Sequence, residues 1–247
     1  MAPSGAAAVA ARRTTPWWTW LLPAFSVAFF IFFIGPPFLG RPFGPYPLMK
    51  IADVLDLFTP LVLIPLYWLL FTRVVNRAPG LKENLAFMVL AAFWVLGQGM
   101  HLAANSIGHL LEGQAGTPVF NLTSFYDEVL SHYLWHFGVI GLSGLIIFRG
   151  WRYPSAGGNS INAAAIAGGI IYGFTYFLLI VEGATTPMGV TFAVLALLFI
   201  VIWGRKGLRR QPLLFFFFIA YLLAALFFAG WGIYWGGLPE FSKVGFL

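Results

Sequence analysis

The chain has 247 residues, of which 60% are hydrophobic and only 9% are charged. Ordinary soluble domains carry about 25% charged residues, so this composition excludes a soluble globular protein and indicates a polytopic membrane protein. Cysteine is absent, which excludes disulfides, thiolate metal sites and catalytic thiols. The formal net charge of +6 does not indicate a nucleic-acid partner, because the basic residues lie in loops and beside apolar segments, where membrane topology accounts for them.

Seven apolar segments are long enough to cross a bilayer as helices, which takes about 20 residues. They cover residues 17–35, 52–73, 83–111, 128–149, 160–181, 187–204 and 211–236. No small-residue cleavage site follows the first segment, so we interpret it as a retained span. The sequence therefore predicts an all-α cell-membrane protein with one seven-helix domain over residues 17–236. Tails over residues 1–16 and 237–247 complete it, and the membrane is the inner one if the source is Gram-negative.

The basic residues predict the orientation of these spans. Eleven of the 14 lysines and arginines fall on the side that holds the N-terminus: Arg12, Arg13, Arg73, Arg77, Lys82, Arg149, Arg152, Arg205, Lys206, Arg209 and Arg210. By the positive-inside rule, the N-terminus is cytoplasmic and the C-terminus lies outside.

Histidine is confined to one part of the sequence. All four histidines lie within 36 residues of each other, on the third and fourth segments: His101, His109, His132 and His136. Polar and ionisable groups are expensive inside a bilayer, so such a cluster is a candidate functional site by default.

Helical periodicity places these side chains on matched faces, because positions four residues apart share a face. The third segment carries four polar side chains in this pattern: His101, Asn105, His109 and Glu112. The fourth carries three: Glu128, His132 and His136. With the outer helix ends level, we expect His109 beside His132, and Asn105 beside His136. Asp127 is then rotated about 100° away from the histidine face.

Imidazole with carboxylate is a normal ligand set for zinc, copper or iron. We therefore predict an outward-facing transition metal site between the third and fourth spans, with zinc favoured over copper and iron. Its candidate ligands are His101, Asn105, His109, His132 and His136. Asp127 or Glu128 is the candidate general acid or base. Haem or pigment ligation and a hydrogen-bonded or proton-conducting network remain alternatives, and Asp127 also suits a helix N-terminus.

Four of these residues, His101, Asp127, His132 and His136, resemble the site of the alkaline ceramidase and adiponectin receptor superfamily. That resemblance implies zinc held within a seven-helix bundle and used for lipid amide hydrolysis. The sequence departs from the family pattern at Gly97, where the family has serine. It also carries the H-x3-H pair on the fourth span rather than the seventh.

A second resemblance is to the third membrane subunit of particulate methane and ammonia monooxygenases. It involves an Asn-x3-His pair, an acidic pair and a later histidine: Asn105, His109, Asp127, Glu128 and His136, or His132 in place of the last. This resemblance implies a membrane oxidoreductase subunit. The family's separate Asp-x3-His-x12-His site is missing here.

The leading functional hypothesis is a zinc-type hydrolase of a lipid or other membrane-soluble substrate. The runner-up is a copper or iron membrane oxidoreductase, or a subunit of one. A non-enzymatic metal carrier or cofactor-holding subunit is a third hypothesis. Besides the lipid bilayer, the expected partners are membrane proteins that contact the small-residue face of the fifth span, formed by Ala165, Gly169 and Gly173.

The predicted topology is tested by reporter fusions at the two ends of the chain. We expect a reporter that is active only in the cytoplasm to work at the N-terminus and to fail at the C-terminus, because 11 of 14 basic residues fall on one side. A cytoplasmic signal from the C-terminal fusion would contradict both the seven-span count and the outward orientation of the histidines.

Overall fold

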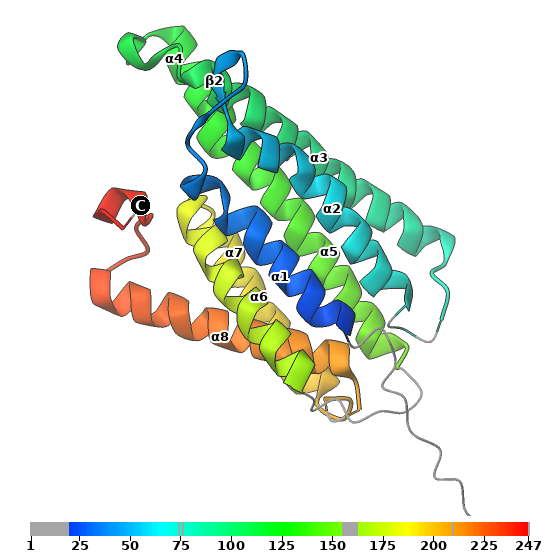
Figure 1. Ribbon diagram of the computed structural model, residues 1–247. Helices are drawn as coiled ribbons and strands as arrows, with labels where there is room; N and C mark the ends of the chain where they lie inside the picture. Colours follow the sequence, from blue (N-terminus) through cyan, green and yellow to red (C-terminus); the bar gives the residue numbers. More distant parts are fainter. Residues whose placement is uncertain (1–19, 74, 76, 155–162, 209, 247) are drawn as a thin grey trace, which may run out of the picture.

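The computed structural model describes residues 20–73, 75, 77–154, 163–208 and 210–246, and this part is predominantly helical (Figure 1). Within it, six helical stretches are long and apolar enough to cross a membrane. They are α2 (Ile51–Arg73), α3 (Leu81–Gly108), the stretch Pro118–Arg152, α6 (Ala163–Glu182), the stretch Thr186–Gly204 and α8 (Pro212–Trp235). The prediction of an all-α multi-pass membrane protein is confirmed.

The first expected span corresponds to α1 (Leu21–Ile34), which has 14 residues. A helix of this length rises about 21 Å, less than the roughly 30 Å of a hydrocarbon core. Even so, α1 packs against α2 and α6 with one face, on which Leu22, Phe25 and Phe29 are fully buried. Residues 17–19 of the expected span and the expected tail 1–16 lie outside the described residues, so a count of seven crossings stays a prediction.

The connection between α1 and α2 is ordered. A 3-10 turn (Pro36–Phe38) leads into an antiparallel hairpin of β1 (Pro42–Phe43) and β2 (Tyr46–Lys50). The backbone of Lys50 donates a hydrogen bond of 2.7 Å to Asp53 Oδ2, which caps the start of α2. Pro60 and Pro65 both lie inside α2, which stays continuous through them.

The fourth expected span is longer than the sequence pattern indicates. It comprises α4 (Pro118–Ser124), the π-helix η4 (Phe125–Ser131) and α5 (His132–Arg152), after a short 3-10 turn at Glu112–Gln114. Thr117 Oγ1 accepts a hydrogen bond from the Phe120 backbone, and Pro118 suits the first helical position. The segment expected as a loop up to residue 127 is therefore largely helical, and α4 projects beyond the other helix ends (Figure 1).

The small-residue face of α6 is used within the chain. A Cβ atom at Gly169 would lie 2.9 Å from the Phe216 carbonyl oxygen, and one at Gly173 would overlap the backbone of Ala220. Ala165 on the same face is fully buried. Because α8 occupies this face, the expectation that it binds another membrane protein is wrong. Close helix approach, the physical reason for the pattern, is correct.

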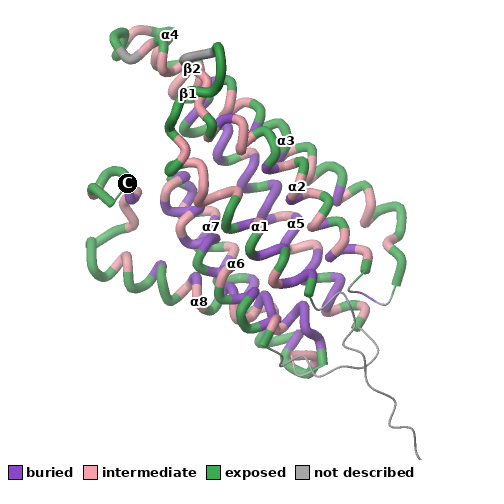
Figure 2. The backbone as a smooth tube through the Cα atoms, in the orientation of Figure 1, coloured by how far each residue is buried: buried purple, intermediate pink, exposed green. Residues whose placement is uncertain are grey.

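The last helices frame one side of the bundle. A helical stretch formed by α7 (Thr186–Phe199) and the π-helix η5 (Ile200–Gly204) precedes α8, which diverges from the bundle toward its C-terminal end (Figure 1). Buried residues concentrate where the helices face one another, whereas the last turns of α8 are exposed (Figure 2). After α8, the chain reaches a 3-10 turn (Ser242–Val244), where the Ser242 backbone donates a hydrogen bond to Glu182 Oε2.

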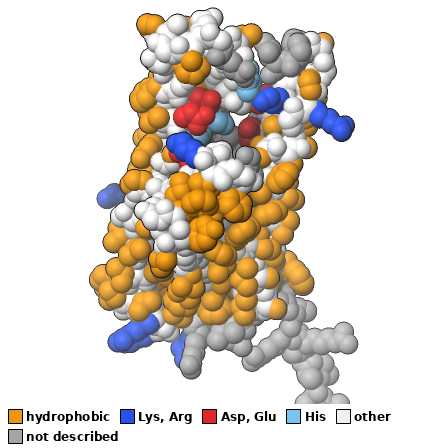
Figure 3. All heavy atoms as spheres, turned by 90° about the vertical axis from the view of Figure 1, so that its left-hand side faces the viewer, with side chains coloured by type: hydrophobic (Ala, Val, Ile, Leu, Met, Phe, Trp, Pro, Cys, Tyr) orange, Lys and Arg blue, Asp and Glu red, His pale blue; other side chains and the backbone are white. Residues whose placement is uncertain are grey.

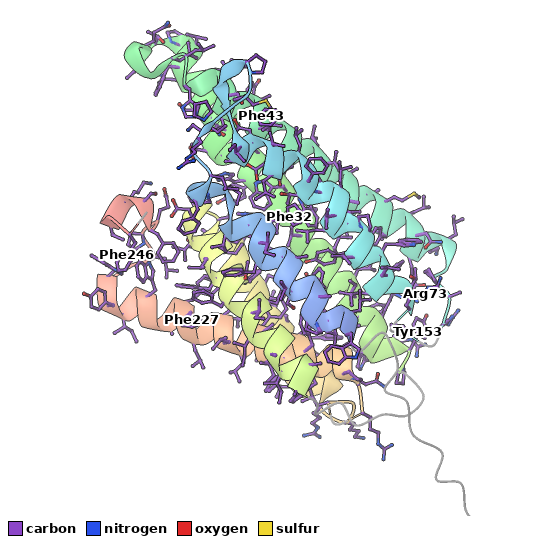
Figure 4. The ribbon with its side chains drawn as sticks, in the orientation of Figure 1. Phe32, Phe43, Arg73, Tyr153, Phe227 and Phe246 are labelled. Carbon is purple, nitrogen blue, oxygen red and sulfur yellow. The ribbon has the colours of Figure 1, made fainter. Side chains whose placement is uncertain are left out.

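A buried ion pair holds the opposite end of the bundle. Arg149 on α5 is fully buried, with Nη1 2.5 Å from Glu83 Oε2 of α3. Its Nη2 also donates a hydrogen bond of 2.6 Å to the Arg77 carbonyl oxygen in the connection between α2 and α3. Figure 4 shows Arg73 and Tyr153 at this same end, far from Phe43 of the hairpin. The arginine thus fixes three segments to one another.

Helices α3 and α5 approach closely at a glycine, which generates a stability prediction. A Cβ at Gly97 would lie 2.5 Å from Trp135 N and 2.6 Å from Ser131 O, whereas one at Gly99 meets nothing within 4 Å. We expect Gly97→Ala to lower the free energy of unfolding by about 1–3 kcal/mol through overpacking. Gly99→Ala is the matched control and leaves it unchanged or slightly higher. Thermal unfolding in detergent measures both, and equal shifts would contradict the assigned contact.

Candidate functional site

Three of the four histidines meet near the end of the bundle that carries the hairpin and α4. The ring centroids of His101 on α3 and His132 on α5 are 5.0 Å apart, and those of His132 and His136 are 5.9 Å apart. His136 is fully buried, and the His101 side chain is 22% exposed. The cluster therefore extends from the protein interior to its surface.

The register between the two helices differs from the expected one. His132 lies beside His101 rather than beside His109, because its helix begins at Pro118 and places His132 farther from the helix end. His109 is the C-cap of α3, eight residues and about 12 Å along the axis from His101. The expectation that His109 lies beside His132 is therefore wrong, and His109 is separated from the other three candidate histidine ligands. Asn105 is half-buried one turn from His101, and the side chain of Glu112 lies outside the described residues.

The two carboxylates are also placed differently from the prediction. Asp127 is buried, with Oδ1 2.8 Å from His101 Nδ1, whereas Glu128 is exposed. The cause is the π-helix η4, in which hydrogen bonds join residues five apart and each turn takes an extra residue. Asp127 precedes His132 by five residues and so shares its side of the helix. The expectation that Glu128 shares the histidine face is wrong.

A turn that sequence reasoning missed contacts both histidines of α5. His132 Nδ1 donates a hydrogen bond of 3.2 Å to the Gly183 carbonyl oxygen, and His136 Nδ1 is hydrogen-bonded to Thr185 Oγ1. Both partners lie between α6 and α7. The signal in the sequence is the short run Gly-Ala-Thr between two apolar segments, but no periodicity relates it to α5.

The order of glycine and alanine in this turn is unusual for its backbone conformation. The Thr185 backbone donates to the Ile180 carbonyl oxygen and Ala184 donates to that of Val181, which is a Schellman motif at the end of α6. The left-handed position of that motif normally holds glycine, but here it holds Ala184, with φ of 52°. The glycine, Gly183, stands one residue earlier, where any Cβ would overlap Cε1 of His136.

The remaining ring nitrogens determine what the cluster can do. Because a carbonyl oxygen only accepts, the proton of neutral His132 lies on Nδ1 and the lone pair on Nε2. His136 Nε2 is buried and has no hydrogen-bond partner among the described residues. As they stand, no three histidine, aspartate or glutamate side chains in the described part converge closely enough to hold a metal ion.

The cluster is open on one face of the molecule. Figure 3 shows histidine, acidic and basic side chains gathered on that face, above a broad apolar surface. The Glu182 carboxylate lies at the end of α6, and the Glu240 carboxylate is 2.6 Å from Lys243 Nζ in the C-terminal segment. This carboxylate raises the pKa of Lys243. Asp56, one turn into α2, interacts electrostatically with His101.

A second polar cluster lies deeper in the bundle. The hydroxyls of Tyr67, Ser143 and Tyr172 are fully buried and lie 2.8–3.1 Å from one another, joining α2, α5 and α6. Ser143 follows His136 by seven residues, about 10 Å along the axis. These hydroxyls satisfy one another's hydrogen bonds, so a role in packing accounts for them.

The helices and their apolar composition define a multi-pass all-α membrane protein. Among known proteins, the chain is similar to the ceroid-lipofuscinosis neuronal protein 6 homolog of Canis lupus familiaris, with 26% identity over 184 residues. The match covers 66% of this chain and 58% of the relative, so it spans less than two thirds of the relative's length. No family model matches the chain. No solved structure matches it either.

The pairing of Asp127 with His101 generates a second stability prediction. We expect Asp127→Asn to lower the free energy of unfolding by about 1–3 kcal/mol, because a largely buried charge-assisted contact is lost. Glu128→Gln is the adjacent control and should change little, because this side chain is exposed. Denaturation in detergent measures both variants. A larger loss in Glu128→Gln would restore the original assignment of the two carboxylates.

Proposed function

We propose that this protein is a metal-dependent, zinc-type hydrolase that acts on a lipid or another membrane-soluble substrate. The supporting observation is that each of three imidazoles has a partner next to Nδ1. Nδ1 of His132 and of His136 is hydrogen-bonded to the Gly183 carbonyl and to the Thr185 hydroxyl, and Nδ1 of His101 lies 2.8 Å from Oδ1 of Asp127. Metal-ligating histidines almost always use their second nitrogen in this way, most often with a carboxylate or a carbonyl. His101, His132 and His136 are the proposed ligands through Nε2.

The spacing of the rings supports this assignment. Imidazoles bound to one tetrahedral zinc at about 2.0–2.1 Å have their centroids roughly 5 Å apart, and the two neighbouring pairs here are 5.0 and 5.9 Å apart. Because no three donor groups converge as they stand, the proposal requires the outer two rings to turn toward His132. The buried Nε2 of His136, which lacks a partner among the described residues, gains one in that arrangement.

The residues around the imidazoles have separate roles in the proposed reaction. A bound zinc ion lowers the pKa of its water toward about 7 and so supplies a nucleophile at neutral pH. Asp127 would hold the ring of His101 through Oδ1, on the side of the ring away from a zinc ion bound at Nε2, and so would keep that ligand oriented. The exposed Glu128 exchanges protons with solvent at the mouth. Asn105, one turn from His101, is close enough along the helix to orient substrate.

The position of the cluster supports a membrane-soluble substrate. His101 is the partly exposed member of the three imidazoles, and the face on which the cluster opens continues into apolar surface (Figure 3). A molecule with an apolar chain and a polar, hydrolysable group can lie along this face with its polar end at the histidines. A fully water-soluble substrate would gain nothing from the apolar part of that surface.

The metal content of the purified protein tests the proposal. We expect about one equivalent of zinc after purification without chelator, and its loss in His101→Ala, His132→Ala and His136→Ala. His109→Ala is the matched control and should keep the metal, because His109 lies about 12 Å along α3 from His101. Elemental analysis measures all five proteins.

Each result of this experiment selects one hypothesis. Copper or iron in place of zinc would favour the membrane oxidoreductase. A metal-free wild type that also fails to bind added zinc would contradict the proposal and favour a hydrogen-bonded network. Metal loss in His109→Ala alone would show that the site lies at the end of α3 instead.

A further inference from the structure

The geometry of the turn between α6 and α7 points to a role that its sequence does not suggest. We infer that Gly183 and Thr185 are positioning residues that fix which ring nitrogen of His132 and His136 carries the proton. The use of those imidazoles as zinc ligands rests on the proposed function. The effect of the turn on their tautomers does not, because it concerns hydrogen bonds within the protein.

The argument for His132 follows from donor and acceptor chemistry. The Gly183 carbonyl oxygen can only accept, so the bond of 3.2 Å requires the proton on Nδ1 of His132. In the neutral ring, Nε2 then carries the lone pair. A side-chain substitution cannot remove a backbone carbonyl. The hydrogen bond to His132 therefore depends on the path of the backbone through the turn.

The argument for His136 uses its burial. If the Thr185 hydroxyl donated to Nδ1, the ring proton would lie on Nε2, which is buried and has no hydrogen-bond partner among the described residues. A buried N–H without an acceptor is costly, so the ring donates from Nδ1 to Thr185 Oγ1. Nε2 of His136 therefore carries a lone pair, as Nε2 of His132 does.

The positions of glycine and alanine in the turn indicate that Gly183 is there to make room for the ring of His136. Local backbone conformation favours glycine at the left-handed position 184, which holds alanine instead. The glycine stands at position 183, where the ring of His136 leaves no room for a Cβ. Steric contact with the imidazole therefore explains Gly183, and the backbone conformation alone does not. Non-glycine residues in such strained positions cluster at functional sites.

Nuclear magnetic resonance of protein with 15N-labelled histidine tests the inference without metal. Full-length protein in detergent micelles, stripped of metal, should show His132 and His136 as Nδ1–H tautomers. Thr185→Val, which removes the hydroxyl at nearly constant shape, should shift His136 toward the Nε2–H tautomer, and Thr185→Ser should restore the wild-type signal. Thr175→Val is the control, since the hydroxyl of this buried threonine donates a hydrogen bond to the Ile171 carbonyl of its own helix.

Titration with Co²⁺, a spectroscopic substitute for zinc, measures how each substitution changes the affinity for metal. Loss of a hydrogen bond to a ligating histidine typically weakens metal binding about 10–100-fold, and we expect this loss in Thr185→Val and a near-complete recovery in Thr185→Ser. Gly183→Ala should also weaken binding, because its new methyl group displaces the ring of His136. Ala184→Gly in the same turn should leave it unchanged.

The two measurements separate the two claims. If the wild type binds no Co²⁺, the metal proposal is refuted. If the His136 tautomer nevertheless changes in Thr185→Val, the positioning role is upheld. An unchanged His136 signal in a folded Thr185→Val would refute the positioning role, whatever the metal result. If Thr185→Val does not fold, the tautomer of His136 in the wild type decides, since an Nε2–H signal there overturns the inference.

Discussion

Inside a bilayer there is no water to satisfy a polar group, so each buried donor or acceptor depends on a partner supplied by the protein. The arrangement of this molecule follows from that constraint. At one end, Arg149 binds Glu83 and a backbone carbonyl, and in the middle three hydroxyls bind one another. At the other end, three imidazoles are each held from one side only. His136 Nε2 is buried without a hydrogen-bond partner among the described residues, as are Arg149 Nε and the Tyr221 hydroxyl. The histidine cluster differs from those places because two further imidazoles lie beside the unpaired atom, which is why we propose the function there.

The elements that build this cluster come from four parts of the chain. Helix α3 carries His101, the π-helix η4 places Asp127 beside it, and α5 carries the other two rings. The α6–α7 turn is hydrogen-bonded to both rings of α5. The helices that present the rings are fixed by close glycine contacts such as Gly97 against α5. Closely packed elements thus place the three imidazoles near one another, and metal binding would require only the outer two rings to turn.

Sequence reasoning predicted the class of fold correctly and identified a group of neighbouring histidines, because long apolar segments and i, i+4 spacing are local properties. It included His101, His132 and His136 among the candidate ligands of one site, but it expected His109, not His101, beside His132. It misplaced His109 and Glu128 because the register between α3 and α5 depends on where the second helix begins, and because a π-helix changes the angular step between residues. It missed Gly183 and Thr185 entirely, since their contacts cross about 50 residues of sequence and carry no periodic signal.

The order of two neighbouring residues in the α6–α7 turn has a consequence for protein engineering. A designer who optimised the backbone alone would exchange Gly183 and Ala184, giving the left-handed position the residue it prefers. That exchange would improve the local conformation and put a methyl group where the His136 ring now lies. Sequence optimisation based on backbone conformation would thus disrupt the candidate site. The departure from the glycine preference at position 184 marks this site more clearly than any motif does.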